Sequence, residues 1–444
     1  MSNLVSGCII LRDMVSIRRI FSAGQPVPEK YRRNFNHLYW DIAWWGLLNG
    51  SVLVFLAIYA SRIGASTFQL GLLTASPALV NLLITFPAGT LLRRTPTQRA
   101  VRLSALITRL FYLLLIPLPL LFTAPARVWI IIAITLVMSI PGTFIAIIFN
   151  AFFAEVIPPG MRGQVAGTRN ALFAATSMLT SLVVGLILTH TPFATGYMLV
   201  FAIGFLGAMM STLHLFLIRV PPSPLQTPVL MMPQVKHELE EVNQAPLRSS
   251  RLSAIRMDVV KSPFGRVLLM MGLFQLAIFI ISPIVPKYQV NVLELSDGTI
   301  SLGSAVFWVV HFVGSLRTRN LAARIGFQRQ TGYGIFFTAA ALTVFAFSFE
   351  NWIYIAHQVI SGIGWALVSG AVVNYVLENL PVNDRAPYLA WYNLANNAAV
   401  LVSGLFAPMI AGWIGLFPLL MVAVGLRLLV GYVILRWGKA KTDA

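Results

Sequence analysis

One acidic residue stands out because it lies inside a long apolar run. Asp41 occurs in the aromatic segment 39–45, near the start of the apolar run 37–60. A carboxylate at such depth is a candidate to bind and release a proton. Its position near the beginning of a helix, where the dipole stabilises negative charge, favours a structural role instead. Trp45 and Asn49 follow at i+4 and i+8, on the same helix face.

The sequence offers little for catalysis. It contains no P-loop, no HExxH motif and no carboxylate cluster of the kind that binds metal. Gly362-x-Gly364 lies within an apolar run, where glycines permit close packing. Cys8 is the only cysteine, which excludes an intramolecular disulfide and a cysteine-based metal site. We predict no enzyme, no cofactor and no metal.

The composition places most of the chain in lipid. Hydrophobic residues are 57% of the 444 residues, charged residues 10%, and the mean hydropathy is +0.79. A soluble domain needs far more charged surface. The apolar runs are continuous and about 20 residues long, which favours helices over the alternating strands of a β-barrel. We predict an all-α membrane protein with twelve transmembrane helices, at 37–60, 68–92, 100–122, 127–151, 167–190, 195–218, 265–288, 299–318, 330–349, 351–377, 387–411 and 414–436.

The net charge of +18 is compatible with a nucleic-acid partner, but its distribution argues against one. Lys and Arg gather in alternate loops, as the positive-inside rule requires. With a cytoplasmic N-terminus, the cytoplasmic segments carry 27 of the 32 Lys and Arg residues. Two lie within spans, Arg109 and Arg427, and three lie in outer loops, Arg62, Arg127 and Lys287. We predict cytoplasmic termini in the cell membrane, of the prokaryotic inner-membrane type, and no nucleic-acid partner.

The chain repeats a charged turn at half its length. The pattern E-x-x-P-x-x-x-R at 155–162 returns 223 positions later at 378–385, and Asn170 maps onto Asn393. A second repeat, at a shift of 230, relates basic turns after the second and eighth spans: Arg94 to Arg324 and Arg99 to Arg329. These repeats indicate a duplicated bundle.

A polar stretch separates the two halves. Residues 219–264 open with a proline-rich segment and continue with clustered charges. Since six spans precede it, both halves start from the same side and the repeat is parallel. We predict a cytoplasmic tail at 1–36, a six-helix bundle at 37–218, a cytoplasmic linker at 219–264, a second six-helix bundle at 265–437 and a cytoplasmic tail at 438–444.

This layout resembles the major facilitator superfamily. The loop signature of that family has the form G-x-L-a-D-r-x-G-r-r. The first copy here keeps Gly89, Leu91 and Arg94 but has Arg93 at the Asp position, and the second has Ala323 there. The resemblance implies a cytoplasmic charge network that closes one transport state. Its members would be Arg93, Arg94, Arg99, Glu155, Arg162, Arg324, Arg329, Glu378 and Arg385. The alternative is that the arginines only fix topology.

In that family, spans one, four, seven and ten line a central cavity. The resemblance therefore implies substrate-facing side chains on these spans and on span eleven: Trp45, Asn49, Thr143, Asn150, Gln275, Gln358, Ser361, Trp365, Tyr392, Asn393 and Asn396. Small polar residues in membrane helices also serve helix packing, which is the alternative for each.

These observations predict a secondary transporter that works by rocker-switch alternating access. Aromatic side chains and few buried charges favour a small organic, partly apolar solute, and we expect proton-coupled efflux by a monomer. Its expected partners are the solute, the lipid bilayer and, as a further candidate, protons. Uptake of a small metabolite is the alternative within this class. A transport-inactive assembly or sensor protein is the alternative from another class, because both loop signatures lack their aspartate.

Overall fold

The computed structural model describes residues 27–92, 96–220, 256–381 and 385–438, without the side chains of 85–92, 319, 385 and 386. Most of the expected linker, both chain ends, Arg93 and Arg94 lie outside the described residues. The described part is all helical, and eleven of its helical segments are long and apolar enough to cross a membrane. The twelfth expected segment corresponds to α15 (Phe327–Ala346), which packs against α16 (Asn351–Glu378) and α18 (Leu416–Trp437). The predicted fold class is confirmed.

The N-terminal half contains six spans. Its first span starts at Glu29, eight residues before the expected position, and runs to Arg62. The half comprises α2 (Glu29–Leu48), a π-helical turn (Asn49–Leu53) and α3 (Val54–Arg62), then α4 (Thr67–Leu92), α5 (Thr97–Leu110) with α6 (Leu118–Leu121), α7 (Ala124–Val156), α8 (Arg162–His190) and α9 (Phe193–Leu217).

The C-terminal half begins with a short helix, α11 (Asp258–Lys261), inside the expected linker. Its first span is broken into α12 (Phe264–Phe279) and α13 (Ile284–Asn291), because Pro283 has no N–H to continue the helical ladder. The other spans are α14 (Asp297–Ile325), α15, α16, α17 (Arg385–Ile414) and α18.

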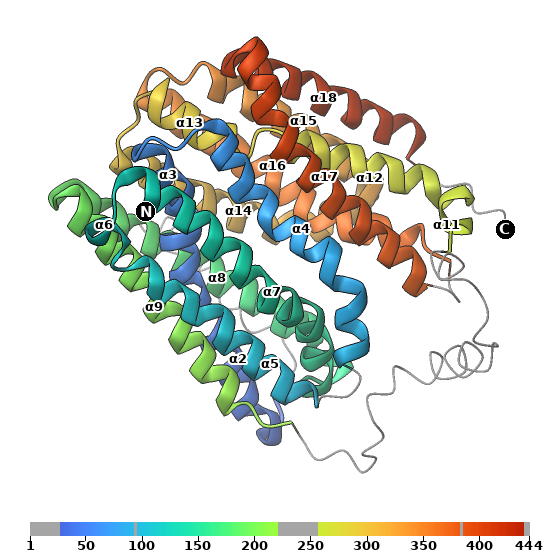
Figure 1. The fold of residues 1–444 in the computed structure, drawn as a ribbon. Coiled ribbons are helices and arrows are strands. Elements are labelled where there is room, and N and C mark those ends of the chain that lie inside the picture. Colours follow the sequence, from blue (N-terminus) through green and yellow to red (C-terminus); the bar gives the residue numbers. More distant parts are fainter. Residues whose placement is uncertain (1–26, 93–95, 221–255, 382–384, 439–444) are drawn as a thin grey trace, which may run out of the picture.

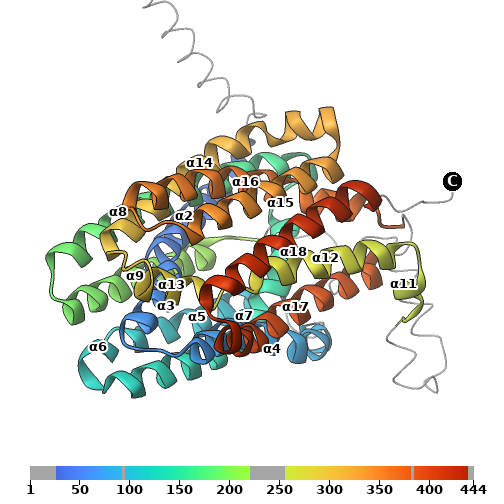
Figure 2. The ribbon, with the colours of Figure 1, turned by 90° about the horizontal axis from the view of Figure 1, so that it is seen from above.

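The two halves lie side by side and meet along two helix pairs, α4 with α17 and α8 with α14 (Figures 1 and 2). We call the end of the bundle where α9 ends and α11 begins the linker face, and the other end the opposite face. Glycines allow the first pair to approach closely: a Cβ at Gly71 would overlap the Gly404 carbonyl oxygen. Gly185 similarly lies against Ser301.

The apolar core is joined at one face and divided at the other. At the opposite face, a single cluster of buried side chains includes both halves, with Tyr59 and Tyr197 from the first and Tyr288 and Phe345 from the second. At the linker face, each half has its own cluster, one around Phe152 and one around Tyr375, Phe264 and Met271. The halves are therefore packed together toward the opposite face and separate toward the linker face.

Candidate functional site

Asp41 lies in a buried charge cluster that joins four helices. Its Oδ2 accepts a hydrogen bond from Arg169 Nη1 on α8 at 3.0 Å, and its Oδ1 lies 3.9 Å from Arg109 Nη2 on α5. Ser211 on α9 donates its hydroxyl to Oδ1 at 2.5 Å. Asp41 is 2% exposed, and Arg109 and Arg169 are 5% and 8% exposed. Two positive charges therefore share one carboxylate, so the cluster carries net positive charge.

Sequence reasoning missed Arg169. The charge count treated it as a loop residue at the inner end of a span, whereas α8 already begins at Arg162 and buries Arg169 two turns later. Its guanidinium also donates to the Leu38 carbonyl at 2.6 Å. One signal was available: Arg169 is the third residue of the apolar run 167–190, where a lone cation needs a partner.

The other two residues of the Asp41 face have partners within the N-terminal half. The Trp45 ring lies over the Arg109 guanidinium at 5.0 Å, a cation–π contact. Asn49 begins the π-helical turn and donates to Ser177 on α8 at 3.1 Å. Both side chains remain half-buried. Such π-helical turns occur frequently at functional sites.

A chain of amides connects the two halves at mid-height. Thr143, which is 3% exposed, donates to Asn81 Oδ1 on α4 at 2.5 Å. Asn81 in turn donates to Asn397 on α17 at 3.1 Å. Thr143 therefore points at a neighbouring helix, as expected for a packing role. Asn150, on the same helix as Thr143, is exposed.

In the C-terminal half, the predicted residues lie on α12, α16 and α17. Gln358 and Gln289 both donate to the Tyr354 hydroxyl, at 2.7 and 3.0 Å. Asn393 is exposed, and the half-buried candidates are Gln275, Ser361, Trp365, Tyr392 and Asn396.

Three polar atoms in this half are buried without a hydrogen-bond partner in the described part of the chain. They are Asn396 Oδ1 on α17, His311 Nδ1 on α14 and Gln330 Oε1 on α15. The other His311 ring nitrogen, Nε2, lies 3.2 Å from the Ser369 hydroxyl on α16. An unpaired buried polar atom costs about 1–3 kcal/mol, so each of these three atoms would gain from a hydrogen-bond partner.

A polar seal joins the halves at the opposite face. Arg62, at the end of α3, forms an ion pair with Asp297 at the start of α14, with an Nη2–Oδ1 distance of 3.0 Å. The Tyr197 hydroxyl donates to the other Asp297 oxygen at 3.1 Å. Lys287 on α13 donates to the Ala65 carbonyl at 2.9 Å. These side chains come from both halves and close the opposite face.

The described members of the predicted charge network at the linker face make local contacts. Glu155 accepts a hydrogen bond from Thr97 at 2.9 Å, and Arg162 donates to the Ala154 and Ile157 carbonyls at the end of α7. Among the residues that the structure describes, no ion pair joins Glu155 or Glu378 to an arginine. Arg99, Arg324, Arg329 and Glu378 are exposed. The Arg385 side chain lies outside the described residues, as do Arg93 and Arg94.

A known protein family matches this chain. The family model of the Major Facilitator Superfamily matches residues 45–404 and 267–443. No curated protein sequence matches the chain.

Solved structures share the fold at low sequence identity. A bacterial homologue of the iron transporter ferroportin, in an inward-facing state, aligns with a TM-score of 0.68 and 13% identity, over 92% of this chain and 99% of that one. A D-xylose–proton symporter aligns with a TM-score of 0.67 and 15% identity, over 92% and 97%. The nucleoside transporter NupG (D323A mutant) gives 0.65 and 13%, over 91% and 100%.

Proposed function

Because the chain belongs to the Major Facilitator Superfamily, we propose that it is a secondary transporter that moves a small organic, partly apolar solute by alternating access. The observation that carries the proposal is the uneven contact between the halves. Polar and apolar contacts join them at the opposite face, while each half keeps its own core at the linker face. We take the linker face as cytoplasmic, so this conformation is open to the cytoplasm.

The charge network at the linker face belongs to the other state in this proposal. When the halves rock together at the linker face, Glu155 and Glu378 become the carboxylates that meet the exposed arginines. The Arg62–Asp297 ion pair then separates. One set of charge contacts is exchanged for another, which keeps the two states close in free energy.

The solute class follows from the side chains that remain available near mid-height. Trp365 and Tyr392 offer apolar faces, and Asn396 Oδ1 and His311 Nδ1 offer hydrogen-bond acceptors or, for the histidine, a donor. A ligand with one or two polar groups on an apolar frame matches this set. In the described part of the chain, the buried Asp41 carboxylate is already occupied by Arg109 and Arg169.

We propose Asp41 as the proton-coupling residue and efflux as the direction. Protonation of Asp41 would leave two buried guanidinium groups without a counter-charge, which is costly. A proton can therefore bind only as α2, α5 and α8 repack. Proton binding is in this way tied to a change in conformation.

Flux in proteoliposomes tests the proposal. The purified full-length protein is reconstituted, a pH gradient is imposed, and a panel of fluorescent organic solutes is followed with wild type, Asp41→Asn and Asp41→Glu. Asp258→Asn, a change at an exposed carboxylate of the linker face, is the matched control. We expect gradient-driven flux in wild type and the control, and its loss in Asp41→Asn.

The outcomes separate the parts of the proposal. Gradient-driven flux that persists in a folded Asp41→Asn protein overturns the coupling role. Absence of flux with every solute overturns transport and favours the assembly or sensor function.

A further inference from the structure

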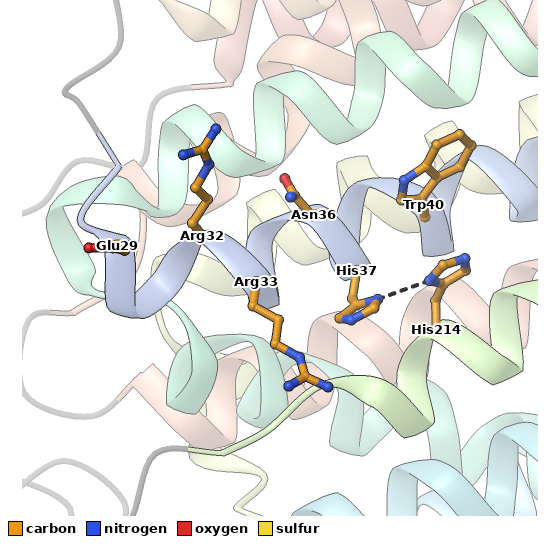
Figure 3. A pocket seen from close by; sticks show the side chains of 7 residues that line it. All are labelled: Glu29, Arg32, Arg33, Asn36, His37, Trp40 and His214. Carbon is orange, nitrogen blue, oxygen red and sulfur yellow. Dashed lines mark hydrogen bonds between the residues drawn. The ribbon is translucent and has the colours of Figure 1, made fainter.

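A pocket lies outside the contact between the two halves, at the linker face between the start of α2 and the end of α9 (Figure 3). Its volume is about 510 Å³. None of the contacts described for the transport site includes its lining residues, which are Glu29, Arg32, Arg33, Asn36, His37, Trp40 and His214.

The outer part of the pocket is basic. Arg32 and Arg33 are exposed and project to different sides of α2 (Figure 3). Within the described residues neither guanidinium forms an ion pair, and Glu29 is the one carboxylate among the lining residues. Two unpaired guanidinium groups beside a cavity favour an anionic ligand, and guanidinium matches phosphate geometry.

The inner part of the pocket is aromatic. His37 on α2 and His214 on α9 lie with their Nδ1 atoms 3.0 Å apart, so one ring donates to the other. The Trp40 ring stacks on His214, with 6.2 Å between centroids. The His37–His214 pair fixes α2 against α9, and the Trp40 indole completes the floor of the pocket as its apolar part.

An exposed apolar side chain extends from this floor away from the linker face. Trp40 is 56% exposed and lies one turn further along α2 than His37. From Glu29 to Trp40 the helix rises about 16 Å, which extends from the headgroup layer into the hydrocarbon. Tryptophan is enriched at this boundary in membrane proteins, and arginine is among the side chains that anchor a span there.

We infer that this pocket binds an anionic phospholipid. Its anionic headgroup lies at the mouth of the pocket, which Arg32 and Arg33 line from two sides, and an acyl chain lies against Trp40. Basic pockets between membrane helices recognise such headgroups. A free phosphate ion would use the arginines but not the apolar floor, so the amphiphilic lining selects the lipid.

Native mass spectrometry of the full-length protein in detergent tests this inference. Phosphatidylglycerol, phosphatidylcholine and inorganic phosphate are titrated against wild type and Arg32→Gln/Arg33→Gln. Lys30→Gln/Arg219→Gln removes the same charge from exposed positions at the same face, outside the pocket, and is the control. Trp40→Ala removes the apolar floor.

We expect wild type and the control to retain one tightly bound phosphatidylglycerol. The affinity should fall about 30-fold in the double arginine variant, as for two charges near a membrane surface, and also fall in Trp40→Ala. Three results would overturn the inference: equal affinity in the arginine variant, an equal loss in the control, or binding of inorganic phosphate as tight as that of the lipid.

Discussion

The Asp41 carboxylate lies 3.0 Å from the Arg169 guanidinium, and both side chains are buried where α2 crosses α8. Arg109 and Ser211 bring α5 and α9 to the same point. Four of the six spans of the N-terminal half are thus held by one carboxylate. Any motion of these helices must keep this cluster or exchange its partners.

Removing the Asp41 carboxylate should destabilise the N-terminal half. Breaking one side of a buried ion pair costs about 3–5 kcal/mol, because the partner charge stays buried. We therefore expect Asp41→Asn to lower the thermal unfolding temperature in detergent clearly, and Arg169→Gln to do the same. The double variant should lose less than the sum. Asp258→Asn, at an exposed ion pair, should leave unfolding unchanged. Additive losses would show that the two residues do not act on each other.

The Arg62–Asp297 ion pair should control opening of the opposite face. Arg62→Gln removes an attraction that exists only while that face is closed, so the open population should rise. The measurement is the spin-label distance between Ser66→Cys and Val292→Cys in a Cys8→Ser background. Arg127→Gln, at the same face but within one half, is the control. The exchange Arg62→Asp/Asp297→Arg should restore the closed distance; if it fails, the pair is not the seal.

The contact of Gly404 with α4 should depend on the absence of a side chain. A Cβ at Gly404 would lie 2.9 Å from the Ala75 Cβ, too close for the present packing. Gly404→Val should therefore separate α4 from α17 and lengthen the same spin-label distance. Gly412→Val, two turns further along α17, meets nothing within 4 Å and should change nothing. An unchanged distance in Gly404→Val would mean that the halves do not need this close approach.

Arg427 should stabilise the break in the first span of the C-terminal half. Its guanidinium donates to the Ala277 and Thr338 carbonyls at 3.2 and 2.8 Å. The Ala277 carbonyl lies in the last turn of α12, where the helical ladder ends. Arg427→Leu should lower the unfolding temperature by several degrees, while Arg436→Leu, an exposed change on the same helix, should not. Equal unfolding temperatures for the two variants would remove this role.

Trp45 and Trp365 should be accessible to water from the cytoplasmic side. In a Cys8→Ser background, Trp365→Cys and Trp45→Cys are each exposed to a membrane-impermeant maleimide added at the cytoplasmic side. We expect labelling of both, and none of Leu429→Cys, whose side chain is on the outside of α18. If neither position is ever labelled, the cavity assignment is wrong.

The sequence alone was sufficient for the helices and for the fold class. A helix in lipid satisfies its own backbone hydrogen bonds, so a continuous apolar run predicts a span from local information. The resemblance to the Major Facilitator Superfamily was drawn from loop patterns and the half-length repeat. The match of that family's model to the chain confirmed it. The breaks at Pro283 and Pro117 interrupt two runs that local reasoning treated as continuous helices.

Tertiary structure decided the partners of each polar group. Arg169 and Asp41 are 128 positions apart, Asn81 and Asn397 are 316 apart, and Arg62 and Asp297 are 235 apart. Hydropathy predicts whether a residue lies in or beside a span. It does not predict how the helix is rotated about its axis or which residue of another helix the side chain contacts. Those depend on how twelve helices pack together, and on which of two faces the halves close. For this protein, the sequence indicated a membrane bundle with a half-length repeat. Packing determined that Arg109 and Arg169 share the Asp41 carboxylate and that the polar seal lies at the opposite face.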